Sequence, residues 1–366
     1  MNAAGGMAEP AFDLAALANV MNAHELKVSD PLRLVPLTGG QSNPTYRIEG
    51  AGRIEAGRIE AGRIEGAGRS YVLRKKPPGQ LLPSAHAIDR EYRVMKALRA
   101  TDVPVPQVFF YCDDAAIIGT PFFIMEFLDG RVMTDQSLPG MTPGERTAIY
   151  FEMNRVISAL HGIDPADVGL GDYGRAGNYF ARQIARWTRQ YRDSQTESIA
   201  SMEALIDWLP ERIPPGEQSA IVHGDFRLDN VVFHATEPRI IGVLDWELST
   251  LGHPLADFSY HCMSWHIPPS LWRGIGGLDL QALGIPSEAE YIARYCEATG
   301  ARALEHWDFY LAYNLFRIAA ILQGIAKRAE DGIAASEDAA ETGRKARPLA
   351  DLGWKIAARY DAVRIE

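Results

Sequence analysis

The pattern of apolar residues changes at Asp129–Gly130, and this change restricts the folds open to the chain. Before it, the segments LRLVPL, TYRIE, YVLRK and PFFIMEF predict short strands separated by turn residues, with one helical pattern, DREYRVMKALRA, among them. After it, helical patterns dominate, as in ERTAIYFEMNRVISALHGI. We therefore predict an α+β protein with a helical extension at 1–28, a strand-rich part at 29–129 and a mainly helical part at 130–366.

Residues 50–69 interrupt the strand-rich part with the repeat GAGRIEAGRIEAGRIEGAGR. Its five-residue period fits neither a helix nor a strand, so the repeat cannot build a continuous apolar face. We interpret it as an expanded loop at the tip of a hairpin, a place that tolerates insertions. A flap over a ligand is the functional alternative, and the order and role of the loop stay open.

Length, charge and cysteine content exclude several classes of protein. A chain of 366 residues with 47% hydrophobic residues can bury a sizeable core in two or three domains. The 37 basic against 47 acidic residues disfavour nucleic acid as a partner. Three cysteines without a C-x-x-C pair indicate a reducing, cytoplasmic setting. The N-terminus lacks a secretion pattern, and no uninterrupted apolar run reaches about 18 residues, so we expect neither export nor a membrane span. The oligomeric state stays open.

One cluster of polar residues indicates chemistry. The segment IVHGDFRLDNVVF places His223, Asp225 and Asn230 after apolar residues, and Asp245 ends the next strand-like run. Because magnesium prefers oxygen ligands, Asn230 and Asp245 are candidate ligands for Mg²⁺. Asp225 is left to orient or deprotonate a hydroxyl group.

This arrangement is similar to the catalytic loop and metal-binding aspartate of protein kinases. The segments HGDFRLDN, LDWE and HPLADF resemble motifs of the aminoglycoside phosphotransferase family of small-molecule kinases. YVLRKKPPG, DREYRVMKAL and FRIAAILQG resemble its branch related to the kinase-like portion of certain acyl-CoA dehydrogenases. The resemblance covers most of 30–330. It implies a two-lobed protein-kinase-like fold, with a five-stranded antiparallel sheet and one helix in the N-terminal lobe, a mainly helical C-terminal lobe, and the nucleotide between them.

The resemblance also assigns catalytic roles. It makes Asp225 the catalytic base, with His223 shaping the loop, and it makes Asn230 and Asp245 the magnesium ligands. No A-P-E segment or long activation loop follows Asp245, which argues against a protein kinase.

For the nucleotide, the resemblance places the cation that contacts the phosphates at Arg74, where protein kinases have lysine. Lys76 lies on the same side of the strand by alternation and could share the role, and Glu91 is the expected acidic partner. Further nucleotide contacts are expected from the backbone of the segment joining the lobes and from the Gly-rich turn TGGQSN. These residues are Glu126, Phe127 and Leu128, and Gly39, Gly40 and Ser42.

We therefore expect an ATP- and Mg²⁺-dependent phosphotransferase acting on the hydroxyl of a small molecule, favoured to be a hydroxy acid or hydroxyacyl thioester. An aminoglycoside or amino-alcohol kinase is the alternative. A negative chain suits such cationic substrates, but a net charge of −10 over 366 residues is ordinary and does not decide between the two classes of acceptor. A non-catalytic nucleotide-binding protein is a third hypothesis, but it would be expected to lose some of Asp225, Asn230 or Asp245. The acceptor, and the choice of ATP over GTP, stay open.

Overall fold

The computed structural model describes residues 12–28, 31–37, 43–49, 70–77, 87–175, 177–334 and 336–365. These residues form two compact units, each described here by itself. The first unit contains the chain up to Arg99, Val105–Asp129 and Asp245–Glu247. The second contains Ala100–Pro104, Gly130–Leu244 and the chain from Leu248 onward.

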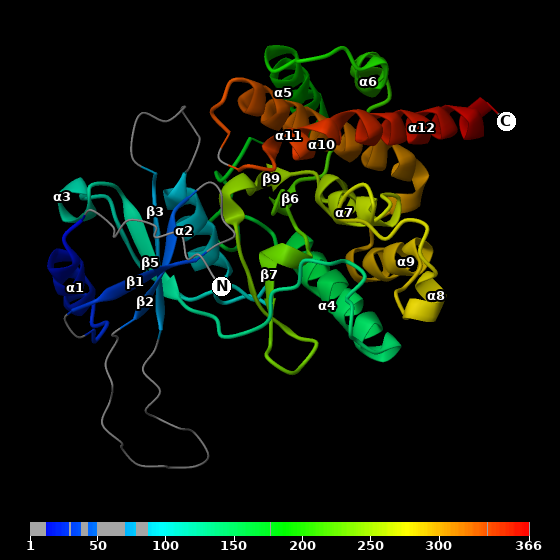
Figure 1. Cartoon of the computed structure of the whole chain (residues 1–366). Coiled ribbons are helices and arrows are strands. Elements are labelled where there is room, and N and C mark those ends of the chain that lie inside the picture. Colours follow the sequence, from blue (N-terminus) through cyan, green and yellow to red (C-terminus); the bar gives the residue numbers. More distant parts are fainter. Residues whose placement is uncertain are drawn as a thin grey trace. The chain divides into compact units, whose positions relative to one another are not determined.

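The first unit is built on a five-stranded antiparallel sheet, as predicted (Figure 1). Its spatial order is β1-β2-β3-β5-β4, so β3 and β5 are central. All five residues of β3 are buried, because both faces of the sheet are covered. The strands are β1 (Arg33–Pro36), β2 (Thr45–Glu49), β3 (Tyr71–Lys75), β4 (Val108–Cys112) and β5 (Phe122–Glu126).

Three helices accompany this sheet among the described residues, where the family resemblance implied one. Helix α2 (Ile88–Leu98) lies on one face, and α1 (Leu14–Ala23) and the short α3 (Ala115–Ile118) lie on the other (Figure 1). Apolar residues of α1 share a buried core with Leu73 and Ile124 of the central strands. The N-terminal helix is thus part of the core of the first unit, and α3 is too short to show a helical period in the sequence.

The second unit is mainly helical, as the sequence predicted. Two antiparallel strand pairs, β6 with β9 and β7 with β8, carry its polar loops. The strands are β6 (Ala220–Val222), β7 (Val231–Phe233), β8 (Ile240–Val243) and β9 (Thr250–Gly252). The helices are α4 (Pro143–His161), α5 (Tyr179–Asp193), α6 (Ala200–Glu211), α7 (Pro254–Cys262), α8 (Leu280–Leu283), α9 (Glu288–Thr299), α10 (Trp307–Glu330), α11 (Ala339–Arg344) and α12 (Ala346–Ile365). Short 3₁₀ turns lie at η1 (Leu228–Asn230), η2 (Trp246–Leu248), η3 (Met263–Trp265) and η4 (Ala303–His306).

Helix α10 is the central helix of the second unit and packs on α5, α6, α7, α11 and α12 (Figure 1). It is the one helix of the described residues long and apolar enough to cross a membrane by length and composition, although polar residues interrupt its sequence. Of that apolar window, 83% is buried inside the unit. Packing within the second unit therefore accounts for the apolar character of α10.

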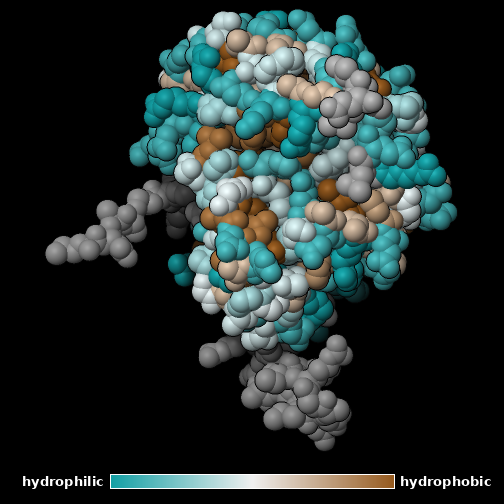
Figure 2. Space-filling model, turned by 90° about the vertical axis from the view of Figure 1, so that its right-hand side faces the viewer, coloured by the Kyte–Doolittle hydropathy of each residue, from teal (hydrophilic) through white to brown (hydrophobic). Residues whose placement is uncertain are grey.

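Exposed hydrophobic residues are scattered. Figure 2 shows one face of the molecule, on which hydrophobic residues form small patches among hydrophilic ones. The large hydrophobic side chains exposed in the described residues come from separate parts of the sequence, namely Leu37, Val132, Leu248, Ile333 and Trp354. Single exposed hydrophobic side chains of this kind are normal for a folded surface.

Candidate active site

The loop after β6 is shaped by His223, which is fully buried. Its Nδ1 accepts the N–H of Asp225 at 3.2 Å, and its Nε2 lies 2.8 Å from the carbonyl oxygen of Leu244. A carbonyl oxygen only accepts, so Nε2 carries the proton and Nδ1 is the acceptor. Both ring nitrogens are therefore engaged by backbone groups, and the contacts of His223 are those of a residue that shapes the loop.

The next residue must be glycine. Gly224 has φ of +83°, and a Cβ atom built there would lie 2.8 Å from the carbonyl oxygen of Leu248. Its N–H donates to Asp257 Oδ1 at 2.8 Å, and its carbonyl accepts from Arg317 Nη2 at 2.6 Å. The turn that presents Asp225 thus needs both the left-handed backbone and the absence of a side chain.

The Asp225 carboxylate is held by three donors within the second unit. Oδ1 accepts the hydroxyl of Tyr260 at 2.5 Å, while Oδ2 accepts Asn230 Nδ2 at 2.8 Å and Arg227 Nε at 3.0 Å. Burial and the charge of Asp225 raise the pKa of Tyr260 above its usual range, so its hydroxyl stays a donor. The side chain of Asp225 remains 16% exposed. This is a fixed carboxylate with room to accept a proton.

Asn230 ends the 3₁₀ turn η1, and its amide orientation follows from its hydrogen bonds. Nδ2 donates to Asp225 twice, to the carboxylate and to the backbone carbonyl at 2.9 Å. The amide oxygen of Asn230 is then the atom left to bind a cation.

Asp257, in the first turn of α7, buttresses the loop. It is 2% exposed and accepts the N–H groups of His223 at 2.6 Å and Gly224 at 2.8 Å. His161 Nε2 lies 3.2 Å from its Oδ2. Burial acts to raise the pKa of Asp257, but the hydrogen bond and charge of His161 and the N–H groups outweigh it and hold that pKa below its ordinary value.

Sequence reasoning missed four residues of this network. Arg227 stands inside the HGDFRLDN motif, so its spacing could have indicated a contact with Asp225. His161 is the last residue of α4, and Tyr260 and Arg317 lie on helices far along the chain from Asp225. No local pattern distinguishes these three from ordinary buried residues.

In the first unit, Arg74 on β3 pairs with Glu91 on α2. Arg74 Nε lies 2.8 Å from Glu91 Oε2, and Nη2 donates to Oε1 at 3.1 Å and to Asp245 Oδ1 at 2.8 Å. Burial opposes the charge of Arg74, but Glu91 and Asp245 outweigh it and raise its pKa. For Glu91, burial is the larger effect and raises the pKa to about 7 against the opposing effect of Arg74.

Asp245 has an unusual backbone. Its φ is +63°, a left-handed conformation that costs energy in a residue other than glycine. Leu244, which precedes it, donates its N–H to the carbonyl of Asn230 at 2.8 Å and accepts from His223. The strained residue Asp245 is thus the direct chain neighbour of Leu244, which is hydrogen-bonded to the loop of Asp225.

The structure describes only some of the other residues that were predicted to contact the nucleotide. Lys76 lies just beyond β3, and within the described ranges Arg74 alone of the two cations contacts Glu91. The carboxylate of Glu126 accepts the N–H of Gln107 at 3.2 Å, and the Phe127 N–H donates to Ser70 at 3.0 Å. Leu128 lies two residues beyond the end of β5 in the chain. Gly39, Gly40 and Ser42 and the repeat at 50–69 lie outside the described residues.

The structure thus brings the predicted site residues together in two groups. His223, Asp225 and Asn230 share one loop of the second unit. Arg74, Glu91 and Asp245 form an ion-pair network in the first unit. Over the part of the chain that the structure describes, no group of three or more His, Cys, Asp or Glu residues could hold a metal ion. A metal here would use the amide and carboxylate oxygens predicted from the sequence.

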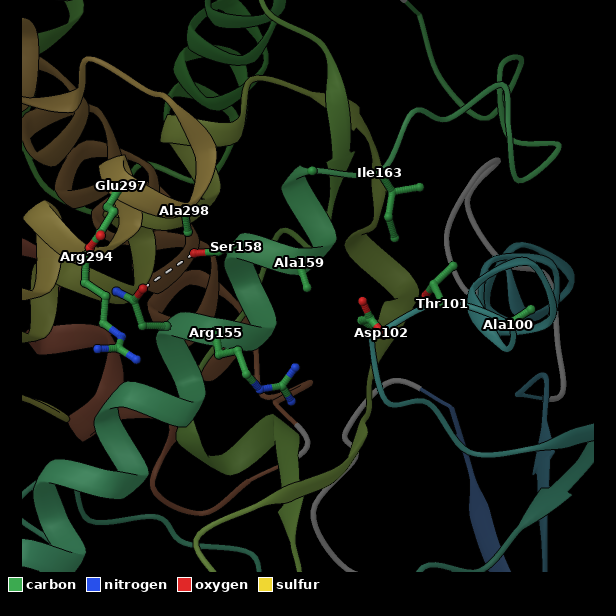
Figure 3. A pocket seen from close by; sticks show the side chains of 12 residues that line it. Ala100, Thr101, Asp102, Arg155, Ser158, Ala159, Ile163, Arg294, Glu297 and Ala298 are labelled. Carbon is green, nitrogen blue, oxygen red and sulfur yellow. Dashed lines mark hydrogen bonds between the residues drawn. The ribbon is translucent and has the colours of Figure 1, made fainter.

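Three cavities are found among the described residues of the second unit, and one of them, of about 240 Å³, is lined by residues of α5, the 213–219 segment and β9. The other two differ in size and in their distance from the predicted site residues. The larger, of about 800 Å³, is lined by the 100–102 segment, α4 and α9, and includes Asp102, Arg155 and Arg294 (Figure 3). None of the predicted site residues lines it. The smaller, of about 30 Å³, is lined by Arg227 and Tyr260, both of which contact Asp225.

Known proteins resemble this chain in sequence and in fold. The profile of the phosphotransferase enzyme family matches residues 33–313. The mouse protein named acyl-CoA dehydrogenase family member 10 is 46% identical over 331 residues, which cover 90% of this chain but 30% of that protein. The chain thus spans less than a third of the length of this relative.

Solved structures show the same fold. A protein of Ralstonia eutropha, provisionally named an aminoglycoside phosphotransferase, is 53% identical, with a TM-score of 0.82 over 95% of this chain and 99% of that one. A thermostable mutant of an aminoglycoside phosphotransferase, solved with AMP-PNP and hygromycin B, has a TM-score of 0.57 at 19% identity over 93% of this chain and 98% of that one. The second likeness shows the fold alone.

These matches confirm the resemblance found in the sequence. The family profile covers most of the chain, and the similar relative carries a matching segment within a longer protein. The chain belongs to the phosphotransferase enzyme family, in the branch similar to the kinase-like portion of acyl-CoA dehydrogenase family members.

Proposed function

We propose that this phosphotransferase is an ATP- and Mg²⁺-dependent kinase for the hydroxyl group of a small molecule, with a hydroxy acid or hydroxyacyl thioester as the favoured acceptor. The observation that carries the proposal is the Asp225 carboxylate, which is held by Tyr260, Asn230 and Arg227 yet remains partly exposed. A positioned carboxylate of this kind suits general-base catalysis.

The chain's residues have separate roles in the transfer. When bound, ATP would supply the phosphoryl group and Mg²⁺ would neutralise the negative charge of its phosphates. Asp225 accepts the proton of the acceptor hydroxyl as the new oxygen–phosphorus bond forms and the bond to the ADP oxygen breaks. His223 keeps the loop in shape by holding the N–H of Asp225.

We assign the nucleotide phosphates to Arg74, kept in place by Glu91. Gly39, Gly40 and Ser42 are proposed to add backbone N–H groups, and Lys76 to supply a second cation. The N–H of Phe127 is used within the sheet, so we propose that adenine is met by other backbone groups between Glu126 and Leu128.

For the metal we propose Asn230 and Asp245. The amide oxygen of Asn230 is left for a ligand because its nitrogen donates to Asp225, and Asp245 has a second carboxylate oxygen beside the one that accepts from Arg74. Two oxygen donors with water in the remaining positions fit the preference of Mg²⁺.

The charges around Asp225 do not decide the acceptor, because the guanidinium groups of Arg227, Arg273 and Arg317 are balanced by the carboxylates of Asp225, Asp229 and Asp257. The name of the similar acyl-CoA dehydrogenase relative favours a hydroxy acid or its thioester.

An aminoglycoside or amino-alcohol acceptor is the second candidate. It is favoured by the names of distant structural neighbours, a hygromycin B complex and a Plasmodium vivax ethanolamine kinase, at 19% and 12% identity. A non-catalytic nucleotide-binding role is disfavoured, because Asp225, Asn230 and Asp245 are all present and hydrogen bonds hold the partly exposed Asp225 carboxylate in place.

The test is phosphoryl transfer from Mg²⁺-ATP to a panel of 3- and 4-hydroxy acids, their thioesters, aminoglycosides and choline. We expect transfer to a hydroxy acid or thioester, and an Asp225→Asn loss of about 10²–10⁴-fold in kcat with ATP binding retained. A fully active Asp225→Asn variant would refute the role of the base. Transfer to aminoglycosides or choline alone would favour the second candidate.

We also propose a cytoplasmic location without nucleic-acid or membrane partners. Cys112, Cys262 and Cys296 are all free thiols in the structure, which suits a reducing compartment.

A further inference from the structure

Arg317 is a buried cation whose position needs an explanation. It lies on α10 and is 6% exposed. Its Nη2 donates to the Gly224 carbonyl at 2.6 Å rather than to a carboxylate of the described residues. Its guanidinium carbon lies 4.9 Å from the ring centre of Tyr260 and 5.5 Å from that of Trp187. Burying a charge is costly, so such a side chain is expected to serve a purpose beyond packing.

The carbonyl that Arg317 binds belongs to the peptide group between Gly224 and Asp225. The N–H of the same peptide group donates to His223 Nδ1 at 3.2 Å. A peptide group is planar, so hydrogen bonds at both ends fix the direction of the backbone from which the Asp225 side chain leaves.

Arg317 also reaches the carboxylate of Asp225 by a second route. Tyr260 stacks against its guanidinium and donates its hydroxyl to Asp225 Oδ1 at 2.5 Å. One side chain of α10 thus contacts both the backbone and the hydrogen-bond donor that orient the carboxylate.

We propose that Arg317 is a positioning residue for the phosphoryl transfer, holding Asp225 through the Gly224 carbonyl and through Tyr260. The inference rests on the proposed function, because it assigns Arg317 to the orientation of the proposed base. Misplacing a reacting group by about 1 Å can cost about 10²-fold in rate.

The test compares Arg317→Met and Arg317→Lys with Gln323→Leu. Gln323 is a matched control, because it is 1% exposed on the same helix and donates to Ser194 and Thr196 rather than to the catalytic loop. We expect Arg317→Met to lower kcat by about 10²-fold with the KM for ATP within about threefold of wild type. Arg317→Lys should recover about tenfold of this loss, because an ammonium group can still donate to the carbonyl.

Amide hydrogen exchange over residues 221–233 supplies a readout that does not need activity. We expect faster exchange in Arg317→Met than in Gln323→Leu at matched stability. If the wild type transfers phosphate and Arg317→Met keeps a kcat within about threefold of the Gln323→Leu control, the inference is overturned while the kinase assignment stands.

The other outcomes are also decisive. If the wild type phosphorylates nothing, the proposed function fails, and unchanged exchange in Arg317→Met overturns the positioning role as well. If Arg317→Met does not fold, Arg317→Lys and Tyr260→Phe replace it, and wild-type kcat in both overturns the proposal.

Discussion

Asp257→Asn is the change that most directly tests how the catalytic loop is held. The Asp257 carboxylate is buried and accepts the N–H groups of His223 and Gly224, while His161 lies 3.2 Å from Oδ2. An asparagine keeps one of the two oxygens and replaces the other with an NH₂ group. Whichever way the amide turns, that group faces an N–H group that also donates.

The expected cost follows from these contacts. Asp257→Asn removes at least one hydrogen bond to a charged group, worth about 1.5–3 kcal/mol, and leaves a buried N–H unsatisfied at about 1–3 kcal/mol. Together we expect a loss of about 3–5 kcal/mol in the free energy of unfolding of the second unit.

Urea denaturation at pH 7 measures this loss. Asp308→Asn is the control, because Asp308 is likewise a carboxylate in the first turn of a helix, α10, but its ion-pair partner Arg359 is 54% exposed. Such exposed pairs contribute about 0–1 kcal/mol. An Asp257→Asn loss below about 1 kcal/mol, similar to that of the control, would refute the buttressing role.

The pH dependence gives a second check. The pKa of Asp257 is held below its ordinary value in the folded protein, so its contribution to stability is present above the unfolded pKa of about 4 and is lost as pH falls. The unfolding free energies of wild type and Asp257→Asn should therefore converge as pH falls below about 4. A constant difference down to that pH would contradict the ionised carboxylate.

Two further changes have defined outcomes. Arg74→Met should raise the KM for ATP by about tenfold or more, because it removes a charge-assisted contact with the phosphates, whereas Lys76→Met should raise it less. Steady-state kinetics measure both values. A larger rise in Lys76→Met than in Arg74→Met would assign the phosphates to Lys76. Burial lowers the pKa of His261 to about 4, so the unfolded chain takes up a proton below about 6.5 and stability falls between these values. Between pH 7 and pH 4, His261→Gln should therefore lose about 3 kcal/mol less free energy of unfolding than the wild type, as measured by urea denaturation at both pH values. An equal loss in the variant and the wild type would contradict a buried neutral imidazole.

Much of the loop of Asp225 could be predicted because its chemistry is local. His223, Asp225 and Asn230 lie within eight residues, and a strand, a turn and a 3₁₀ turn bring them together whatever surrounds them. Four of the five strands of the first unit, β1, β2, β3 and β5, could likewise be located from their short apolar runs, whereas β4 was not. Their order, β1-β2-β3-β5-β4, was not predicted, because period-two alternation marks a strand without naming its neighbour.

The sequence by itself determined the kind of chemistry, through the spacing of Asp225, Asn230 and Asp245 and the resemblance that this spacing carries. Only the tertiary structure decided which distant side chains support it. Arg74 meets Asp245 across 171 residues, and Arg317 meets Gly224 across 93. Such contacts depend on how helices and strands pack, and packing is set by the complementary shapes of many side chains together, which no local pattern contains.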